Sequence, residues 1–438
     1  MNSFKNAAVA TLVAVALLAT GCTENNNPLA PTPGADEFNA DIAIVWMDLA
    51  ADLVKAERWT PPLASRLFGY AGVTLYESVV NGMPDKRSLV GQLNELDALP
   101  DFGNEKYHWP TVVNAAMATL MRGLFANSTA ASLDAIAVLE QLNNSQFVDD
   151  IDADTFERSI NKGKLLGLAI FGWSLNDSYP LYNNCAFTPP TGDGKWIPTP
   201  PLFAAPLQPC WGEIRPFVLS SGYDCLPGPP PTYSETPDTP FYNEMMEVYN
   251  TCESLTTEEH AIADFWSDNP GETSTPPGPS ISITGQVLSL ENKKLGFAAE
   301  TYAKVGMTVA DAFISCWKTK FEYNLLRPGS CIRALVQADW ASPIPTPAFP
   351  EYTSGHSVQS GATAAVLTSL FGANYSFTDH THDIRGLTPR TFASFSAYAD
   401  EAAISRLYGG IHFRSAIEVG IDQGDCIAGK VLALQFEK

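Results

Sequence analysis

Apolar residues along this 438-residue chain recur mostly at the spacing of an α-helix. Between 40 and 57, Ile44, Met47, Ala51 and Val54 fall close to one stripe, as in a helix that buries a single face. Pro61 can open the next helix, to about 80, because the first turn does not need the missing N–H. The periodicity predicts further helices at 110–125, 132–142, 155–175, 241–252, 257–266, 289–326, 357–370, 390–408 and 414–436. No stretch alternates convincingly like a strand, so we expect a mainly helical, all-α fold.

The segment 178–239 breaks this pattern, because it is rich in proline, glycine and cysteine and cannot stay helical for long. It could be a linker between domains. Its aromatic residues, Trp196, Phe203, Trp211 and Phe217, indicate instead a long loop that packs on the helices. We therefore expect one helical catalytic domain over 39–438.

The N-terminus has the features of an export signal. Lys5 precedes an apolar stretch over 7–19, and Thr20-Gly21-Cys22 follows. We interpret 1–21 as a signal peptide, Cys22 as the lipidated residue and 22–38 as a tether, although Ala19 replaces the leucine usual in a lipobox. A membrane-spanning helix fits less well, because the stretch is shorter than the roughly 20 residues that a bilayer needs. The expected location is the cell envelope, as a lipoprotein of the outer membrane or facing the periplasm, with secretion as the alternative.

Charge and cysteine content narrow the function. The net charge of −22 argues against binding to nucleic acid, which requires clustered Lys and Arg. Seven cysteines follow Cys22 without any CxxC pair, so neither a structural zinc site nor a thiol redox motif is indicated. In an oxidising compartment, those between Cys185 and Cys225 are candidates for disulfides, but the sequence leaves their connectivity open.

Three segments of the last third carry residues suited to an oxyanion: KFEYNLLRP (320–328), FPEYTSGHS (349–357) and ISRLYGGIHFRS (404–415). In the first, Lys320 and Arg327 lie seven residues apart, so they share one face if the helix persists. A guanidinium beside an ammonium can neutralise a multiply charged anion. Taken alone, such a pair is more often a solvated basic edge.

Ser354, Gly355 and His356 precede a helix expected to begin near 357. There, free N–H groups and the helix dipole favour an anion. Ser354 offers a hydroxyl and Gly355 a backbone N–H. Alone, this pattern could equally be a capped helix with an interfacial histidine.

Arg406 and His412 lie six residues apart, about 120° out of register on a continuous helix. Gly409-Gly410 between them can break the helix, which allows the two side chains to converge. Without the other two segments, His412 would be interpreted as a core histidine at a helix junction.

The order Lys-x6-Arg-Pro, Ser-Gly-His, Ser-Arg-x5-His resembles the signature of the vanadium-dependent haloperoxidases. The acid phosphatases of the phosphatidic-acid-phosphatase type 2 superfamily share it. The flanking residues are most similar to the bacterial iodoperoxidases. One motif would be weak evidence, whereas three in order are strong. The resemblance implies the helical bundle of that superfamily and orthovanadate as cofactor.

The resemblance also implies roles for individual residues. The vanadate-binding residues are Lys320, Arg327, Ser354, Gly355, Arg406 and His412, and the catalytic residues are Lys320, His356, Arg406 and His412. His412 would bond vanadium, or attack phosphorus in a phosphatase. His356 would activate bound peroxide, or protonate the leaving group. Trp317 and Phe349 would be pocket walls, although either could be ordinary core.

Two positions depart from the family pattern. Thr353 replaces the usual proline before the serine, which affects the stiffness of the loop more than its chemistry. Ala416 stands where many members carry an aspartate that orients the second histidine. Glu418 would lie on another helical face, so a backbone carbonyl or water could hold His412 instead. The run 379–383 (DHTHD) contains His-x-His, but we interpret it as a polar loop rather than a metal site, because no further ligand follows.

The leading hypothesis is a haloperoxidase that oxidises a halide, with iodide preferred, using hydrogen peroxide. A small organic acceptor stays open as a further partner. The same oxyanion site would serve an exported acid phosphatase that forms a phosphohistidine at His412. A non-catalytic oxyanion-binding lipoprotein is the third hypothesis, which the two histidines oppose, because binding alone needs neither.

Overall fold

The computed structural model describes residues 33–103 and 105–438, so the expected signal peptide and Cys22 lie outside the described residues. The prediction of an all-α bundle is confirmed. Residues 33–438 group into one compact unit. Within the described part of the chain, no helix is both long enough and apolar enough to cross a bilayer.

Helices account for most of the fold. The α-helices are α1 (Asp41–Ala56), α2 (Pro61–Val79), α3 (Trp109–Leu124), α4 (Ala130–Phe147), α5 (Ala153–Ser174), α6 (Tyr179–Tyr182), α7 (Pro240–Glu253), α8 (Thr257–Phe265), α9 (Pro277–Leu290), α10 (Leu295–Tyr323), α11 (Pro328–Leu335), α12 (Gly355–Phe371), α13 (Phe395–Tyr408) and α14 (Arg414–Leu432). Short 3-10 helices lie at Ala35–Glu37, Val80–Gly82, Trp211–Glu213 and Asp383–Arg385. Strands β1 (Phe377–Asp379) and β2 (Arg390–Phe392) pair antiparallel, with Phe377 opposite Phe392.

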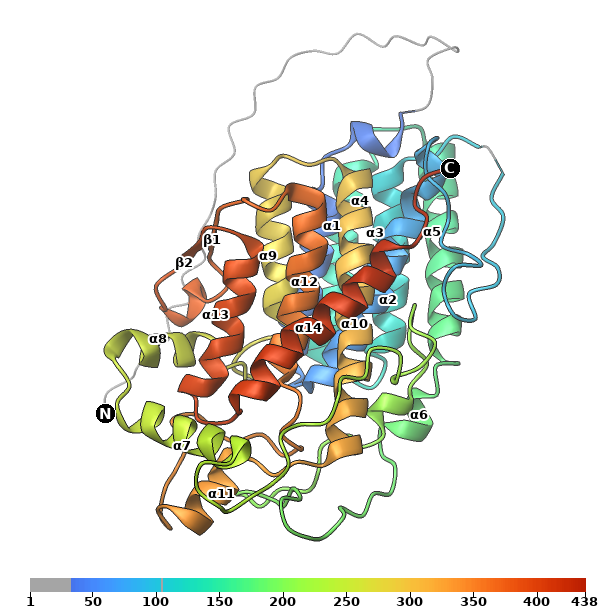
Figure 1. Cartoon of the computed structure of the whole chain (residues 1–438). Coiled ribbons are helices and arrows are strands. Elements are labelled where there is room, and N and C mark those ends of the chain that lie inside the picture. The colour runs from blue at the N-terminus through green and yellow to red at the C-terminus, as the bar shows by residue number, and fades with distance from the viewer. Residues whose placement is uncertain (1–32, 104) are drawn as a thin grey trace, which may run out of the picture. The chain divides into compact units, whose positions relative to one another are not determined.

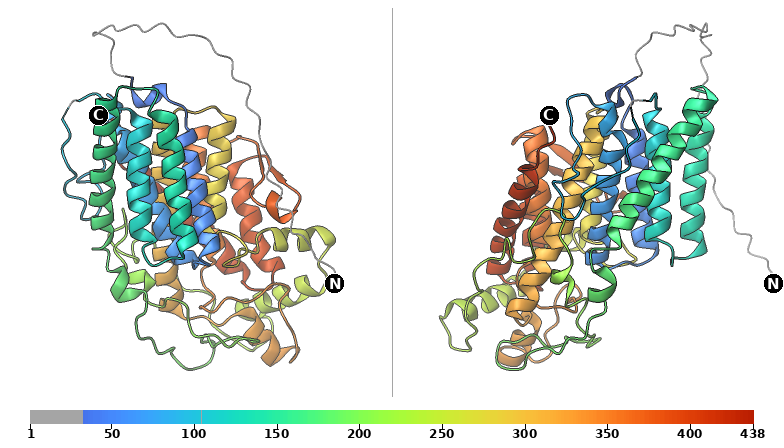
Figure 2. Two further views of the ribbon diagram at one scale, coloured as in Figure 1. Left: turned by 180° about the vertical axis from the view of Figure 1, so that it is seen from behind. Right: turned by 90° about the vertical axis from the view of Figure 1, so that its right-hand side faces the viewer.

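The long helix α10 lies at the centre of the bundle (Figure 1). Its residues are almost all buried. It packs against α2 on one side and against α12 and α14 on the other. Beyond α2 lie α3 and then α5, so Figure 2 shows successive layers of helices in its right-hand view. Because α10 contacts both halves, the residues at its C-terminal end are surrounded by protein.

Two helix predictions are wrong in their boundaries. The helix expected at 289–326 is shorter, because α10 begins at Leu295 and ends at Tyr323, and α9 before it was not predicted. The run TPPGPS (275–280) looks like a loop, yet its prolines lie at the start of α9, where proline is tolerated. The helix expected at 390–408 begins at Phe395, because its first residues form β2. Strands of three residues are too short to show alternation.

The loop over 178–239 packs on the helices as expected and contains only short helical turns. Trp196, Trp211 and Phe217 are buried, whereas Phe203 is largely exposed, contrary to expectation. Disulfides join Cys185 to Cys210 and Cys225 to Cys426. The Cys225–Cys426 disulfide links the loop covalently to α14, with a sequence separation of 201 residues. The described cysteines with free thiols are Cys252, Cys316 and Cys331.

Candidate active site

The three motif segments meet where α10 ends. Lys320 lies in the last turn of α10 and Arg406 in that of α13. Arg327 and Ser354 are the N-cap residues of α11 and α12. His412 lies between α13 and α14, where Gly409 and Gly410 end the helix as the sequence indicated.

Lys320 and Arg327 do not share one helix, contrary to the helical interpretation of their spacing. Helix α10 ends at Tyr323, because Asn324 adopts a left-handed backbone (φ 54°). Arg327 is extended, as a residue before proline prefers, and caps α11, which begins at Pro328. The two cations converge because the chain turns between the helices.

His412 is held between a guanidinium and a carboxyl group. Its Nε2 lies 3.1 Å from Arg327 Nη1, and its Nδ1 lies 2.8 Å from Glu351 Oε1. An arginine can only donate, so Nε2 must present its lone pair, and the proton of the neutral ring lies on Nδ1. Glu351 Oε1 also accepts the backbone N–H of Phe413 at 2.9 Å. The Nε2 lone pair therefore points at the Arg327 guanidinium.

Burial controls protonation of this pair. It drives the pKa of His412 well below its ordinary value, and the nearby Arg327 and Lys320 add to the effect. Burial also raises the pKa of Glu351 to about 8, against the opposing influence of the same two cations. His412 is thus a neutral ring at neutral pH, the form that can act as a ligand or nucleophile.

Arg327 is fully buried and has one unsatisfied donor. Its Nε donates to the carbonyl of Phe349 and its Nη1 to that of Ile411, each at 2.8 Å. Among the described residues Nη2 has no hydrogen-bond partner. Burial lowers its pKa to about 10, so it still carries its charge at neutral pH. A buried charged donor without an acceptor is costly, and an anion in the site would supply one.

Lys320 is also fully buried, but its ammonium group is occupied. It donates to the backbone carbonyls of Pro350, Glu351 and Thr353. Burial, with Arg327 beside it, lowers its pKa to about 8. Lys320 therefore anchors the loop that carries Glu351, in addition to placing positive charge behind the site.

A cavity of about 400 Å³ opens at this point. Its walls include Trp317, Phe349, Gly355, His356, Arg406 and His412, whereas Lys320, Arg327 and Ser354 lie behind them. The ring centroids of Trp317 and Phe349 are 4.8 Å apart. Phe349 lies 4.8 Å from the Arg327 guanidinium carbon and 5.1 Å from Lys320 Nζ, within cation–π range. The aromatic wall thus shields two buried cations.

His356 lies on the cavity wall and is oriented by Asp268. Its Nε2 lies 3.1 Å from Asp268 Oδ2. Burial lowers the pKa of His356 to about 4, as does Arg406, while Asp268 opposes this. Burial alone would raise the pKa of Asp268, but His356, His382 and Arg406 hold it below its ordinary value. An ionised carboxylate only accepts, so His356 carries its proton on Nε2 and has its lone pair on Nδ1.

The remaining predicted donors lie nearby. Ser354 Oγ accepts the backbone N–H of Ser357 at 3.3 Å, which caps α12 and leaves the hydroxyl proton free to donate. Gly355 lines the cavity, and a Cβ there would be in ordinary van der Waals contact with Trp317, at 3.8 Å. Arg406 donates through Nε to Ser405 Oγ and through Nη2 to the carbonyl of Trp266.

The sequence did not identify Glu351 and Asp268. Glu351 replaces the aspartate missing at Ala416, while Glu418 is largely exposed and pairs with Arg414 at 3.6 Å. A possible signal was that Glu351 is the one acidic residue of FPEYTSGHS, although nothing indicated its partner. Asp268 follows α8 in a polar stretch and gave no signal. No group of three His, Cys, Asp or Glu side chains within the described ranges could hold a metal ion on its own.

These residues fit a tetrahedral oxyanion such as vanadate. A buried guanidinium has a donor without a partner, and a neutral histidine presents its Nε2 lone pair beside it. Lys320, Arg327 and Arg406 supply three positive charges to the same end of the bundle. Such a set can bind the oxygens by charge and the central atom through one nitrogen.

Comparisons with known proteins point the same way. Residues 335–437 match the family model of the second helical-bundle domain of VCPO. The structure is similar to that of a bacterial vanadium-dependent iodoperoxidase, with 35% identity and a TM-score of 0.84 over 92% of this chain and 98% of that one. Bacterial vanadium-dependent chloroperoxidases in apo and holo forms share the fold at 14% and 15% identity, with TM-scores of 0.63 and 0.62. The apo match covers 84% of this chain and 93% of that one, and the holo match covers 94% and 95%.

A search of the curated proteins found no match. The match to the iodoperoxidase extends over nearly the whole of both chains. Its 35% sequence identity indicates common family membership in addition to a common fold. The chain belongs to the vanadium-dependent haloperoxidases, peroxidases that act on halides.

Proposed function

We propose that this protein oxidises iodide with hydrogen peroxide, using vanadate bound to His412. The observation that carries the proposal is the neutral His412 ring, whose Nε2 lone pair is held by Glu351 and Arg327 toward the buried cations. Bound vanadate would supply a Lewis-acidic centre that polarises peroxide toward attack by a halide.

The chain's own residues have separate tasks in this proposal. Arg327 and Arg406, with Ser354 and the N–H of Gly355, donate hydrogen bonds to the oxyanion. Lys320 adds charge and holds the loop that carries Glu351. His356 accepts and returns a proton at Nδ1, while Asp268 keeps Nε2 protonated. Asp268 orients His356, to which we assign proton transfer, and Glu351 orients His412, to which we assign cofactor binding.

Iodide as the preferred halide has three supports. Iodide is the most easily oxidised of the common halides, so it makes the least demand on peroxide activation. The cavity is also largely apolar, with Trp317, Phe313 and Phe349 on its walls, which suits a large and weakly hydrated anion. The similar solved structure at 35% identity is an iodoperoxidase.

The test is reconstitution of vanadate-free protein with orthovanadate. We expect peroxide-dependent iodide oxidation to appear, chloride turnover to be poor or absent, and excess phosphate during loading to suppress activity by occupying the same site. Chloride rates equal to iodide rates would refute the halide assignment. Loading that is indifferent to phosphate would refute a shared oxyanion site.

Phosphate-ester hydrolysis by the vanadate-free protein is a second candidate activity of this site. Glu351 favours it, because a carboxyl group on Nδ1 increases the nucleophilicity of Nε2. The expected reaction forms a phosphohistidine at His412 and releases the alcohol. We would measure p-nitrophenyl phosphate hydrolysis with and without vanadate, which should inhibit it. No hydrolysis by protein that binds phosphate would eliminate this activity.

The proposed location is the cell envelope, with residues 1–21 removed and Cys22 lipidated. The sequence from Lys5 to Cys22 supports this. Expression with labelled palmitate should label the wild-type protein and leave C22S unlabelled; equal labelling would refute it.

A further inference from the structure

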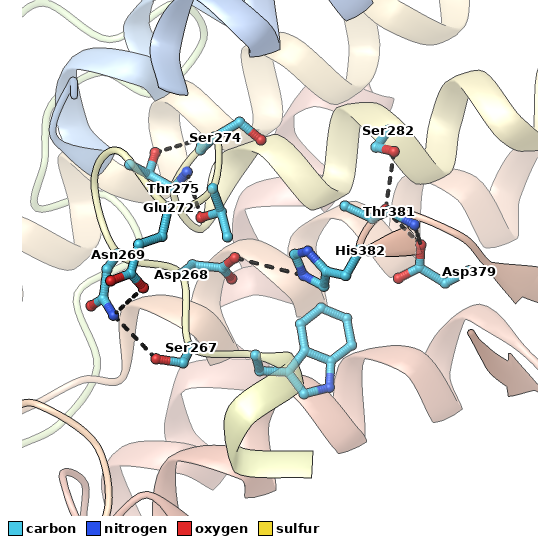
Figure 3. Close-up of polar contacts among 12 residues, drawn as sticks. Ser267, Asp268, Asn269, Glu272, Ser274, Thr275, Ser282, Asp379, Thr381 and His382 are labelled. Atoms are coloured by element: carbon cyan, nitrogen blue, oxygen red, sulfur yellow. Dashed lines mark hydrogen bonds and ion pairs between the residues drawn. The ribbon is translucent and has the colours of Figure 1, made fainter. Parts of the chain in front are cut away.

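A second histidine, His382, faces the carboxylate oxygen of Asp268 that His356 does not contact. His382 Nε2 lies 3.9 Å from Asp268 Oδ1, and both side chains are buried, at 3% and 0% exposure. In Figure 3 the His382 ring and the Asp268 carboxylate point toward each other. Asp268 thus has one oxygen toward each histidine, Oδ2 toward His356 and Oδ1 toward His382.

The two facing atoms lack other partners. Among the described residues, neither His382 Nε2 nor Asp268 Oδ1 makes a hydrogen bond. At 3.9 Å the contact is longer than a hydrogen bond and too short for a bridging water. A lone pair on Nε2 would repel the carboxylate oxygen, so the favoured tautomer of His382 directs an N–H at Oδ1.

The segment that carries His382 is rigidly held. Thr381 donates through its backbone N–H and Oγ1 to Asp379 Oδ1, and its Oγ1 also contacts Ser282 of α9. These contacts are drawn in Figure 3. The His382 ring stands edge-on to Phe265, with centroids 4.7 Å apart. The ring position is therefore determined by α8, α9 and β1 rather than by the active-site loops.

We propose that His382 is a positioning residue, whose ring N–H holds Asp268 so that Oδ2 orients His356. An N–H directed at Oδ1 attracts that oxygen electrostatically and so opposes rotation of the carboxylate about its Cβ–Cγ bond. Without the His382 N–H, the Asp268 carboxylate can rotate toward Arg406, with which it already interacts electrostatically. His356 then loses the acceptor for its Nε2–H. The inference rests on the proposed function in taking His356 as the acid–base residue.

The first test uses vanadate-free wild-type protein labelled with ¹⁵N-histidine. Ring ¹⁵N shifts report which nitrogen carries the proton. We expect His356 and His382 both to be protonated at Nε2. A proton on Nδ1 of His382 overturns the inference. This result does not depend on peroxidase activity, so failure of the proposed function, seen as no iodide oxidation after vanadate loading, is distinguishable from it.

The second test compares variants at the two histidines of the same loop. H382F keeps a ring against Phe265 but removes the N–H, whereas H382Q returns an N–H donor. His380 is 54% exposed and bonds Asp383, so H380Q is the matched control. We expect H382F to lower kcat about tenfold, with the vanadate Kd within about twofold, and to mix the His356 tautomers. H382Q should recover part of both effects, and H380Q should match the wild type.

Unchanged kcat and His356 shifts in H382F would overturn the proposal. So would loss of vanadate binding in both H382F and H382Q, because the residue would then support the whole pocket rather than Asp268. If H382F does not fold, the wild-type tautomer measurement decides alone.

Discussion

Two contacts of opposite kind keep Nε2 of His412 unprotonated. Arg327 can only donate and therefore requires an unprotonated Nε2, while Glu351 accepts the proton on Nδ1. Glu351 also accepts the N–H of Phe413, so it positions the ring and the backbone beside it. The requirement at this position is an acceptor oxygen, because burial favours the uncharged carboxyl group.

Replacing Glu351 with alanine tests this requirement. We expect E351A to weaken vanadate binding about 10- to 100-fold, because the N–H groups of His412 and Phe413 lose their acceptor. E351Q keeps an acceptor oxygen and should retain most of the affinity. E418A, at an exposed glutamate of α14, is the control. Equilibrium dialysis with orthovanadate measures the effect, and wild-type affinity in E351A would contradict the assignment.

The residues proposed to react could be selected from sequence motifs, but the residues that contact and orient them could not. Lys320, Arg327, His356 and His412 belong to short motifs with characteristic spacing. Asp268 is 88 positions from His356, so its role depends on packing that no local pattern encodes. Where His412 lacked its expected partner at Ala416, the substitute came from another loop.

Helix ends, more than helix interiors, decide how the site is assembled. The apolar periodicity predicted α1, α2, α3 and α14 nearly to their first residues. It could not predict that α10 ends before Arg327, because the decisive feature is the left-handed backbone of Asn324. Apolar residues continue past this point, so periodicity alone extends the helix.

Asn324 therefore offers a test of how helix termination positions Arg327. Valine is strongly disfavoured at φ 54°, so N324V should lose about 1–2 kcal/mol of unfolding free energy and also bind vanadate more weakly. N324G allows this backbone and should bind vanadate like the wild type. Chemical denaturation and dialysis measure the two quantities. Equal vanadate affinity in N324V and N324G would show that the turn does not position Arg327.

Both basic and acidic ionisable side chains are buried across the molecule. Burial lowers the pKa of His108 and of His356 to about 4 each, and it raises the pKa of Glu77 to about 7. Between pH 4 and 6.5 the unfolded chain binds more protons at the histidines, whereas the folded chain binds more at Glu77. The buried histidines and Glu77 therefore change the slope of the unfolding free energy against pH in opposite directions.

Single replacements separate these contributions. His108 raises the unfolding free energy as pH rises from about 4 to 6.5, so H108Q should make the slope of that free energy against pH less positive. Glu77 lowers it as pH rises from about 4.5 to 7, so E77Q should make the slope more positive. H380Q, at an exposed site, is the control. Denaturation at several pH values checks the signs, and shifts in the same direction for both variants would contradict the linkage.

The central claim is that His412 binds vanadate while His356 transfers protons. The most direct measurement is the vanadate Kd, with kcat for iodide oxidation, in wild type, H412A and H356A. We predict that H412A loses most of its vanadate affinity. H356A should bind vanadate nearly as wild type does but turn over about 10²- to 10⁴-fold more slowly. Equal loss of vanadate affinity in the two variants would contradict the division of roles.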